Sequence, residues 1–224
     1  MSVYYKDDLV TLYHGDCLTE HTEWTSADVL VTDPPYGIEW EGIRSRYTDK
    51  INHWTVPANA ITNDSTLDVR DTAIKMWGGG VKPAMVFGVW RKDRPEGTKH
   101  RLVWWKRGQA PGPTRSPFVT QDEEIYILGT GWEKQDSPLR SVIPTSEQRA
   151  RYVSEIGHPT PKPIGLMELL LERCPPGVVA DPFAGSGATL IAARNLGREC
   201  VGVEIEEKYC ELIVQRLSQG ALQL

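Results

Sequence analysis

The sequence predicts an α/β fold, in which a mainly parallel sheet is covered by helices. Short apolar runs alternate with helical patterns along the 224 residues. Near the C-terminal end, a strand, a glycine turn and a helix lead to a second strand that ends in an acidic residue, as in Rossmann-like folds. Only 20 residues follow this unit, too few to complete a sheet covered on both faces. We therefore expect a circular permutation, with the strands of the other half coming first.

In the N-terminal half, apolar runs bounded by turn residues predict strands, and one helical pattern lies among them. The expected strands are Val10–Tyr13, Val29–Thr32, Ala84–Val89, Leu102–Trp105 and Glu124–Leu128. A helix is expected over Leu67–Trp77, with Asp64 or Ser65 as its N-cap and a run of glycines after its end. Trp104 and Trp105 alternate across their strand, so one of them belongs to the core.

In the C-terminal half, helices and strands alternate. The pattern predicts helices over Pro161–Arg173, Ser186–Leu196 and Glu206–Leu217, and strands over Val178–Asp181 and Cys200–Glu204. Proline suits the first turn of the Pro161–Arg173 helix, because the amide hydrogen that it lacks has no partner there. Three stretches carry no assignment and read as long, functional or disordered loops: Gly37–Ala60, Gly108–Thr120 and Gly131–Gly157.

Composition excludes several classes of protein. Hydrophobic residues make up 40% and charged residues 25%, as in ordinary globular proteins. No apolar run approaches the ~20 residues that span a bilayer, and the first residues lack the pattern of a signal peptide. The four cysteines form no CxxC pair, and the histidines lack ligand spacing, which argues against a metal site or disulfides. We expect a soluble, cytoplasmic protein with no metal and no membrane association.

The net charge of −5 argues mildly against a nucleic-acid partner, but its distribution does not. Between Arg91 and Arg115 lie eight basic residues and two acidic ones. Such a segment can follow a phosphate backbone, and it can equally be a solvated loop. Charge alone leaves both interpretations open.

The glycine turn near the C-terminal end has the layout of a nucleoside site. Asp181-Pro182-Phe183-Ala184-Gly185-Ser186-Gly187 follows one strand, and Glu204 ends the next, 23 positions after Asp181. Glycines let the backbone approach a ligand, and an acidic residue can accept hydrogen bonds from ribose. The turn is neither a dinucleotide fingerprint nor a P-loop, and S-adenosylmethionine fits it better. Asp181 would lie near the methionine ammonium group and Glu204 on the ribose; the plainer alternative is an ordinary strand-to-helix turn.

A second motif, Asp33-Pro34-Pro35-Tyr36, follows the strand Val29–Thr32. Two prolines make the turn stiff and remove two amide donors. An aromatic amine is a poor nucleophile, but a carboxylate (Asp33) and a fixed carbonyl (Pro34) can accept its hydrogens and aim its lone pair at a methyl donor. Tyr36 can stack on a base taken out of its helix. The alternative is a rigid turn with an aromatic residue packed beneath it.

These two motifs, in this order, resemble the beta class of bacterial and phage DNA amino-methyltransferases, the N4-cytosine/N6-adenine family. Leu12-Tyr13-His14-Gly15-Asp16-Cys17 is similar to the opening strand of that family, and His158-Pro159-Thr160-Pro161-Lys162-Pro163 to its HPTxKP segment. The resemblance implies a permuted methyltransferase fold and S-adenosylmethionine as cofactor. The implied cofactor-binding residues are Asp16, Cys17, His158, Lys162, Asp181, Phe183, Gly185, Ser186, Gly187 and Glu204.

The resemblance also implies how one methyltransferase domain over residues 1–224 is divided. Residues 1–107 would form the catalytic half, 108–157 a loop-rich, minimal target-recognition region, and 158–224 the cofactor-binding half. DNA would be the partner, with a possible homodimer, in a bacterial cell or a phage-infected one, for restriction-modification or phage DNA protection. The candidate DNA contacts are Arg44, Arg46, Lys106, Arg107 and Arg115.

The first residue of the Asp-Pro-Pro-Tyr motif favours adenine over cytosine as the target base. Family members that act on cytosine N4 more often resemble Ser-Pro-Pro-Tyr, so Asp33 favours N6 of adenine. Cytosine N4 stays the alternative. An RNA or protein-amide methyltransferase fits less well, because those relatives usually resemble Asn-Pro-Pro-Tyr with the cofactor loop first. A silent cofactor- or DNA-binding module is disfavoured, because Asp33, Tyr36 and the glycines are all present.

Overall fold

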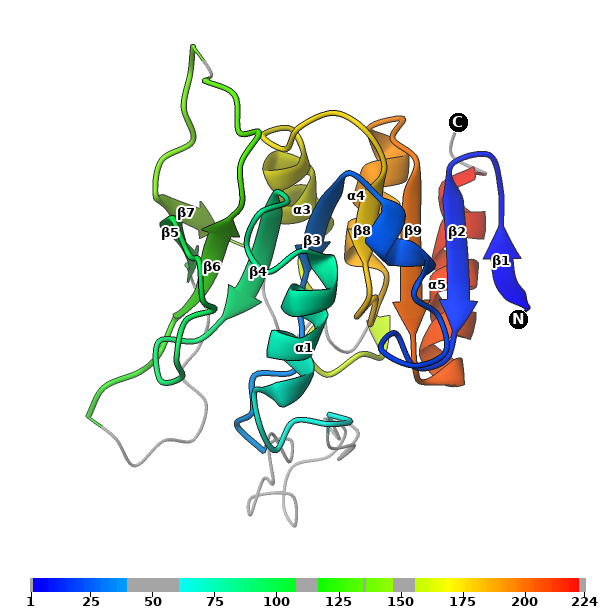
Figure 1. Cartoon of the computed structure of the whole chain (residues 1–224), viewed down its shortest axis with the longest axis horizontal. Coiled ribbons are helices and arrows are strands. Elements are labelled where there is room, and N and C mark those ends of the chain that lie inside the picture. The colour runs from blue at the N-terminus through cyan, green and yellow to red at the C-terminus, as the bar shows by residue number, and fades with distance from the viewer. Residues whose placement is uncertain (1, 40–60, 108–116, 135, 147–155, 222–224) are drawn as a thin grey trace.

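The computed structural model describes residues 2–39, 61–107, 117–134, 136–146 and 156–221. Over these residues the chain forms one nine-stranded mixed sheet with helices on both faces (Figure 1). The strands are β1 (Val3–Lys6), β2 (Val10–His14), β3 (Val29–Thr32), β4 (Ala84–Gly88), β5 (His100–Lys106), β6 (Asp122–Leu128), β7 (Val142–Thr145), β8 (Val179–Asp181) and β9 (Cys200–Glu204). The helices are α1 (Asp68–Trp77), α3 (Ile164–Leu171), α4 (Ala188–Asn195), α5 (Glu207–Ala221) and a short 3₁₀ helix, η1 (Glu23–Ser26). The predicted α/β class is confirmed.

The centre of the sheet is parallel. The strand order is β1-β2-β9-β8-β3-β4-β6-β5-β7, and β2, β9, β8, β3 and β4 all run in one direction. The last two strands of the chain, β8 and β9, therefore lie in the middle of the sheet, between β2 and β3. Strand β6 runs antiparallel to β4, so its amino end lies at the edge where the parallel strands have their carboxyl ends. This edge collects residues from both halves of the chain.

Two hydrophobic layers cover the sheet, and side-chain alternation along the strands divides residues between them. Val29 and Val31 of β3 face the layer formed with α3, α4 and α5, whereas Leu30 faces the layer formed with α1 and η1. In Figure 1, α1 and η1 lie in front of the sheet and α3 and α4 behind it. Every residue of β3 and β4 is buried, as expected for strands covered on both faces. The rigid centre of the sheet thus fixes the strand ends in space.

On the α1 side, two tryptophans hold the layer together. The rings of Trp24 and Trp77 stack with their centroids 6.0 Å apart. Both rings are almost completely buried, and both indole nitrogens donate to backbone carbonyls, Trp24 to Cys17 and Trp77 to Pro83. Buried indoles are stable in a core when their polar edge has a partner in this way.

The predicted elements are present, with shifts of up to four residues at their ends. Within the described residues, three elements were not predicted: β1, η1 and β7, the last of which lies within the unassigned stretch Gly131–Gly157. The predicted N-cap of α1 is wrong, because the helix begins after Leu67 and no side chain caps it. Asp64 instead turns toward the segment after Tyr36. Of the two tryptophans of β5, Trp104 is core and Trp105 is 41% exposed, as the alternation predicted.

The four cysteines are free thiols, and three of them are buried. Among the described helices, none is long and apolar enough to cross a membrane.

The turn after β6 offers a matched pair of glycines for testing how tightly the sheet packs. Gly129 and Gly131 both have positive φ, 77° and 87°, so an alanine carries similar backbone strain at either position. A Cβ on Gly129 would lie 2.0 Å from the Lys82 carbonyl oxygen, whereas a Cβ on Gly131 meets nothing within 4 Å. Gly129→Ala should therefore lower the free energy of unfolding by at least about 2 kcal/mol more than Gly131→Ala. Urea denaturation of both variants measures this difference; equal losses would mean that the backbone around Lys82 yields easily.

Candidate active site

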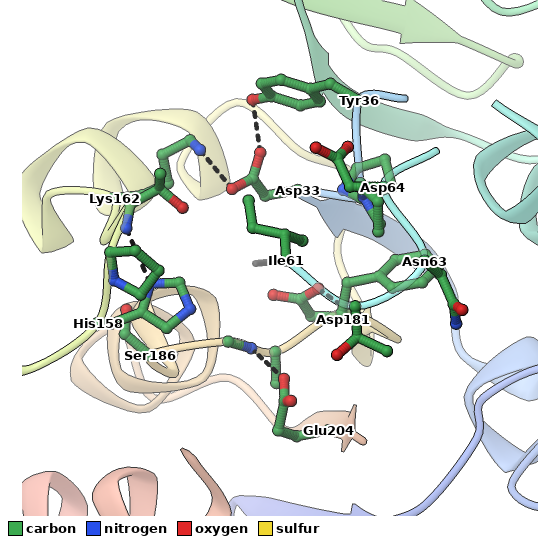
Figure 2. A pocket seen from close by; sticks show the side chains of 18 of the residues that line it. Asp33, Tyr36, Ile61, Asn63, Asp64, His158, Lys162, Asp181, Ser186 and Glu204 are labelled. Atoms are coloured by element: carbon green, nitrogen blue, oxygen red, sulfur yellow. Dashed lines mark hydrogen bonds and ion pairs between the residues drawn. The ribbon is translucent and has the colours of Figure 1, made fainter. Parts of the chain in front are cut away.

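A cleft of about 340 Å³ lies at the edge of the sheet where the parallel strands end. Segments that follow β2, β3, β4, β8 and β9 line it, together with the beginning of β6. Most of the predicted site residues that the structure describes meet here: Asp16, Cys17, Asp33, Pro34, Pro35, Tyr36, Lys106, His158, Lys162, Asp181, Phe183, Gly185, Ser186 and Glu204. Figure 2 shows Asp181 between Asp33 and Glu204, so the acidic residues of three adjacent strand ends share one wall.

Gly187 does not line the cleft, and its role is in the turn. It has a φ of 78° and is the N-cap of α4. A Cβ at this position would lie 2.7 Å from Ile213 of α5, so the glycine also allows close packing of the two helices. Gly185, with a φ of 52°, does line the cleft, and a Cβ there would approach the His158 ring to 3.2 Å. The glycine turn therefore serves both backbone geometry and access to the cleft.

Glu204 is held by backbone amides at the end of β9. Its Oε2 accepts a hydrogen bond from the Gly185 amide (2.7 Å), and its Oε1 accepts one from the Glu206 amide (2.8 Å). The side chain is 6% exposed, and burial raises its pKa to about 7. The carboxyl group thus has a fixed orientation and changes charge near neutral pH.

Asp181 ends the neighbouring strand, β8. Its Oδ1 accepts hydrogen bonds from the Thr32 hydroxyl (2.7 Å) and from the Phe183 amide (3.2 Å). Burial raises its pKa to about 6. A buried carboxylate at this position attracts a cation that enters the cleft.

His158 and Lys162 come from the segment that precedes α3. The His158 ring packs edge-on against Tyr209 of α5, with centroids 4.5 Å apart, and its Nδ1 accepts the Thr160 amide. Burial and the charge of Lys162 lower the pKa of His158 to about 3, so the imidazole is neutral at physiological pH. Lys162 is almost completely buried, and its ammonium group contacts the Asp33 carboxylate directly.

The Asp-Pro-Pro-Tyr turn leaves β3 and is secured by Asp64. The Asp64 carboxylate is 4% exposed and accepts the Gly37 amide at 2.7 Å, while its own carbonyl accepts the Glu39 amide. The turn folds back so that the Tyr36 hydroxyl donates to Asp33 Oδ1 at 2.6 Å. Figure 2 shows Asp33 between Tyr36 and Lys162. The carboxylate is therefore oriented from two sides.

A second carboxylate, Glu123, completes this cluster. Its Oε2 lies 3.0 Å from the Tyr36 hydroxyl and 3.3 Å from the Lys162 ammonium group, and its Oε1 contacts Lys106. Burial raises the pKa of Asp33, and the charge of Lys162 opposes that rise. For Lys162, burial would lower the pKa, but Asp33 and Glu123 outweigh it and hold the pKa above its usual value. Lys162 therefore keeps its charge.

The predicted DNA contacts are placed differently from one another. Lys106 is in the cleft, 12% exposed and paired with Glu123, and does not lie on an open basic surface. Arg107 is outside the cleft lining, with its guanidinium group 5.3 Å from the ring of Trp105. Arg44, Arg46 and Arg115 lie outside the described residues. Arg94 and Arg101 of the basic segment pair with Glu124, so part of its charge is neutralised locally.

Of the cleft residues that sequence reasoning missed, four make contacts that hold the cleft together. Asp64 and Glu123 support the turn at Asp33, and Thr62 donates to Glu206 at 2.6 Å, which joins the segment before α1 to the end of β9. Tyr209 packs on His158. One signal was available for Glu123, because three consecutive acidic residues open an otherwise apolar strand. Within the described residues, no group of three or more His, Cys, Asp or Glu side chains could hold a metal ion.

Comparison with known proteins agrees with this geometry. The chain is 28% identical to the Type II methyltransferase M.ScaI of Streptomyces caespitosus over 262 aligned positions, which cover 99% of this chain and 85% of M.ScaI. It shares its fold with the crystal structure of the M1.HpyAVI–SAM complex (TM-score 0.62, 21% identity, 93% of this chain and 100% of that one). It also resembles the cytosine-N4-specific PvuII DNA methyltransferase (TM-score 0.63, 19% identity, 95% of this chain and 87% of that one).

The match to a family model is broader than any local motif. The model, described as DNA methylase of the N6/N4 type, matches residues 27–215, which include Asp33, the segment around Lys162 and the glycine turn up to Glu204. This chain therefore belongs to the N6/N4 DNA methylase family.

Proposed function

We propose that this protein transfers a methyl group from S-adenosylmethionine to N6 of adenine in DNA. One observation carries the proposal: Asp33 lies in the same cleft as Asp181 and Glu204, at the ends of three adjacent strands. A carboxylate that can accept the hydrogens of an amine is therefore next to two carboxyl groups suited to a cationic nucleoside.

The residues present fit S-adenosylmethionine. Glu204 has one backbone donor on each oxygen, which fixes the carboxylate while a second lone pair of each oxygen can receive the ribose hydroxyls. Asp181 provides a buried negative charge for the methionine ammonium group, and the glycine at 185 keeps the turn open. Cys17 and Phe183 give the cleft apolar walls. The bound cofactor supplies an electrophilic methyl group on a sulfonium.

At the other end of the cleft, Asp33 and the Pro34 carbonyl accept the two hydrogens of an exocyclic amine. This would aim the nitrogen lone pair at the methyl carbon for an in-line displacement, with reacting atoms roughly 3–3.5 Å apart. The N–C bond would form as the C–S bond breaks, S-adenosylhomocysteine would leave, and the methylated nitrogen would release one of its protons to solvent. The base has to leave its helix to reach Asp33, and stacking on an aromatic ring such as Tyr36 partly offsets the lost base stacking. Lys162 and the Tyr36 hydroxyl keep Asp33 in place while this occurs.

The choice of adenine over cytosine rests on Asp33 as the first residue of the turn. Cytosine N4 is the second candidate, since a cytosine-N4-specific enzyme has the same fold. For the division of the chain, we propose that residues 108–157 carry target recognition. We also propose that the chain order is a circular permutation, because β8 and β9 come last in the sequence yet lie in the middle of the sheet.

The identity of the methylated base gives the most direct test. The protein is incubated with unmethylated DNA and methyl-labelled S-adenosylmethionine, the DNA is digested to nucleosides, and the labelled product is identified by mass. We expect N6-methyladenine. N4-methylcytosine would keep the mechanism and refute the base assignment, and an unlabelled DNA with intact cofactor binding would favour an RNA or protein substrate or a silent module.

Replacing Asp33 separates catalysis from cofactor binding. Asp33→Ala removes the acceptor for the target amine, so methyl transfer should fall by about 100-fold or more. Binding of S-adenosylmethionine, measured by calorimetry, should be retained, because the cofactor residues lie at the ends of β8 and β9. Asp8→Ala, at an exposed position outside the cleft, is the control and should behave as wild type. Substantial activity in Asp33→Ala would contradict the role given to this carboxylate.

Cofactor binding should depend on pH through Glu204. With a pKa of about 7, Glu204 is largely protonated at pH 6 and largely ionised at pH 8. An ionised carboxylate is the better acceptor for ribose, so affinity should rise about tenfold across this interval. Calorimetric titration of S-adenosylmethionine at several pH values measures the rise. Glu204→Gln should bind weakly with little pH dependence; a wild-type profile in that variant would place the titrating group elsewhere.

A further inference from the structure

Glu123 reaches the catalytic end of the cleft through the direction of its strand. Strand β6 is antiparallel to β4, so its first residues lie where the parallel strands end. Alternation then points Glu123 into the cleft and Glu124 to the opposite face. There Glu124 accepts from the Tyr126 hydroxyl (2.6 Å) and from Arg101 (2.7 Å). Two adjacent, identical side chains therefore have unrelated surroundings.

Glu123 shares its partners with Asp33. The Tyr36 hydroxyl lies 2.6 Å from Asp33 Oδ1 and 3.0 Å from Glu123 Oε2. The Lys162 ammonium group contacts Asp33 and lies 3.3 Å from the same Glu123 oxygen. Both groups that orient Asp33 are thus divided between two carboxylates. Lys106, on β5, holds the other oxygen of Glu123.

This sharing matters because Asp33 has to accept hydrogens from the target amine. A carboxylate that alone receives a lysine ammonium group and a tyrosine hydroxyl has few lone pairs left for a further donor. Glu123 is a second acceptor. The single hydroxyl proton of Tyr36 and the charge of Lys162 are therefore shared between Asp33 and Glu123. With Lys106 included, two carboxylates face two ammonium groups among the described residues, so these buried charges offset one another.

We propose that Glu123 is a positioning residue for methyl transfer, which acts through Tyr36 and Lys162 to keep Asp33 aimed and available to the target amine. The proposal rests on the proposed role of Asp33 as the acceptor for that amine. Glu123 itself does not need to touch the base.

The proposal predicts a direction for the pH dependence. The negative charge of Glu123 raises the pKa of Asp33, after the larger effect of burial, whereas Lys162 lowers it. Removing that charge leaves Lys162 facing Asp33 alone, so the pKa of Asp33 should fall. Among the described residues, the charged and titratable groups that contact Glu123 or its partners are Asp33 and Tyr36 after β3, Lys162 before α3, and Lys106 on β5. Asp181 responds to Asp33 as well, because the charge of Asp33 raises its pKa.

The experiment compares Glu123→Gln with the matched control Glu124→Gln, the same change one residue away on the other face of β6. Single-turnover methyl transfer to DNA is measured from pH 5 to pH 9. In Glu123→Gln we expect the rate at pH 7.5 to fall about tenfold or more and the acidic limb of the profile to move to lower pH. Affinity for S-adenosylmethionine should change less than about twofold. Glu124→Gln should keep the wild-type profile even if its melting temperature falls.

A double variant distinguishes positioning from a general structural role. Tyr36→Phe removes the shared hydroxyl and keeps the ring, so Tyr36→Phe and Glu123→Gln should together cost clearly less than the product of their separate losses. A Glu123→Gln enzyme with the wild-type rate and profile would overturn the proposal. A second result would also overturn it: Glu123→Gln is slower, the acidic limb of its pH profile does not move, and the rate loss in the double variant equals the product of the two single losses.

Failure of the proposed function can be told apart from failure of this inference. Carboxyl carbon NMR of labelled aspartate, assigned with Asp33→Asn, reports the pKa of Asp33 without any turnover. If the wild-type protein methylated no DNA, the proposed function would fail. The NMR titration would still show whether Glu123 controls the pKa of Asp33. An Asp33 pKa that is the same in wild type and in Glu123→Gln would refute it.

Discussion

The pairing of β3 with β8 is the constraint on which the cleft and its proposed site depend. These parallel strands are in register, with Val29 opposite Val179 and Leu30 opposite Ala180, so their carboxyl ends meet at one edge of the sheet. The Thr32 hydroxyl then donates to the Asp181 carboxylate across the two ends, at 2.7 Å. Residues 149 positions apart in the sequence are joined in this way, and the Asp-Pro-Pro-Tyr turn lies beside the glycine turn. Both strands are fully buried, which prevents either from sliding by one residue.

Burial also explains the electrostatics of the cleft. Isolated charges are costly away from water, so the acidic groups are either paired with cations or held by backbone amides. At one end of the cleft, Asp33 and Glu123 face Lys162 and Lys106. At the other end, Asp181 and Glu204 accept hydrogen bonds from hydroxyl and amide donors. The first arrangement keeps charges at fixed positions. The second leaves two carboxyl groups whose pKa values are raised by burial. A cationic ligand would stabilise their ionised forms.

Much of the fold and part of the site could be predicted because their signals are local. The apolar run before Asp33 and the one before Asp181 both predict buried strands, and the glycines at 185 and 187 predict a tight turn, in which both residues have positive φ. The rule that active sites lie at the carboxyl ends of parallel strands then places both motifs in one cleft. The edge strands β1 and β7 escaped prediction, because they are short and only partly buried, and their pattern is weak.

The sequence by itself determined the α/β class, the order of the elements other than β1, η1 and β7, and the residues at the ends of β3, β8 and β9, since each depends on neighbours in the chain. Only the tertiary structure decided what surrounds Asp33. The contacts of Tyr36 with Glu123 and of Lys162 with Asp33 join residues 87 and 129 positions apart. Asp64, which was expected to cap a helix, instead accepts a hydrogen bond from the Gly37 amide. No local pattern encodes such contacts, because they arise from the antiparallel direction of β6 and the packing of the segment before α3. Lys106, which was predicted to contact DNA, lies within the same cluster.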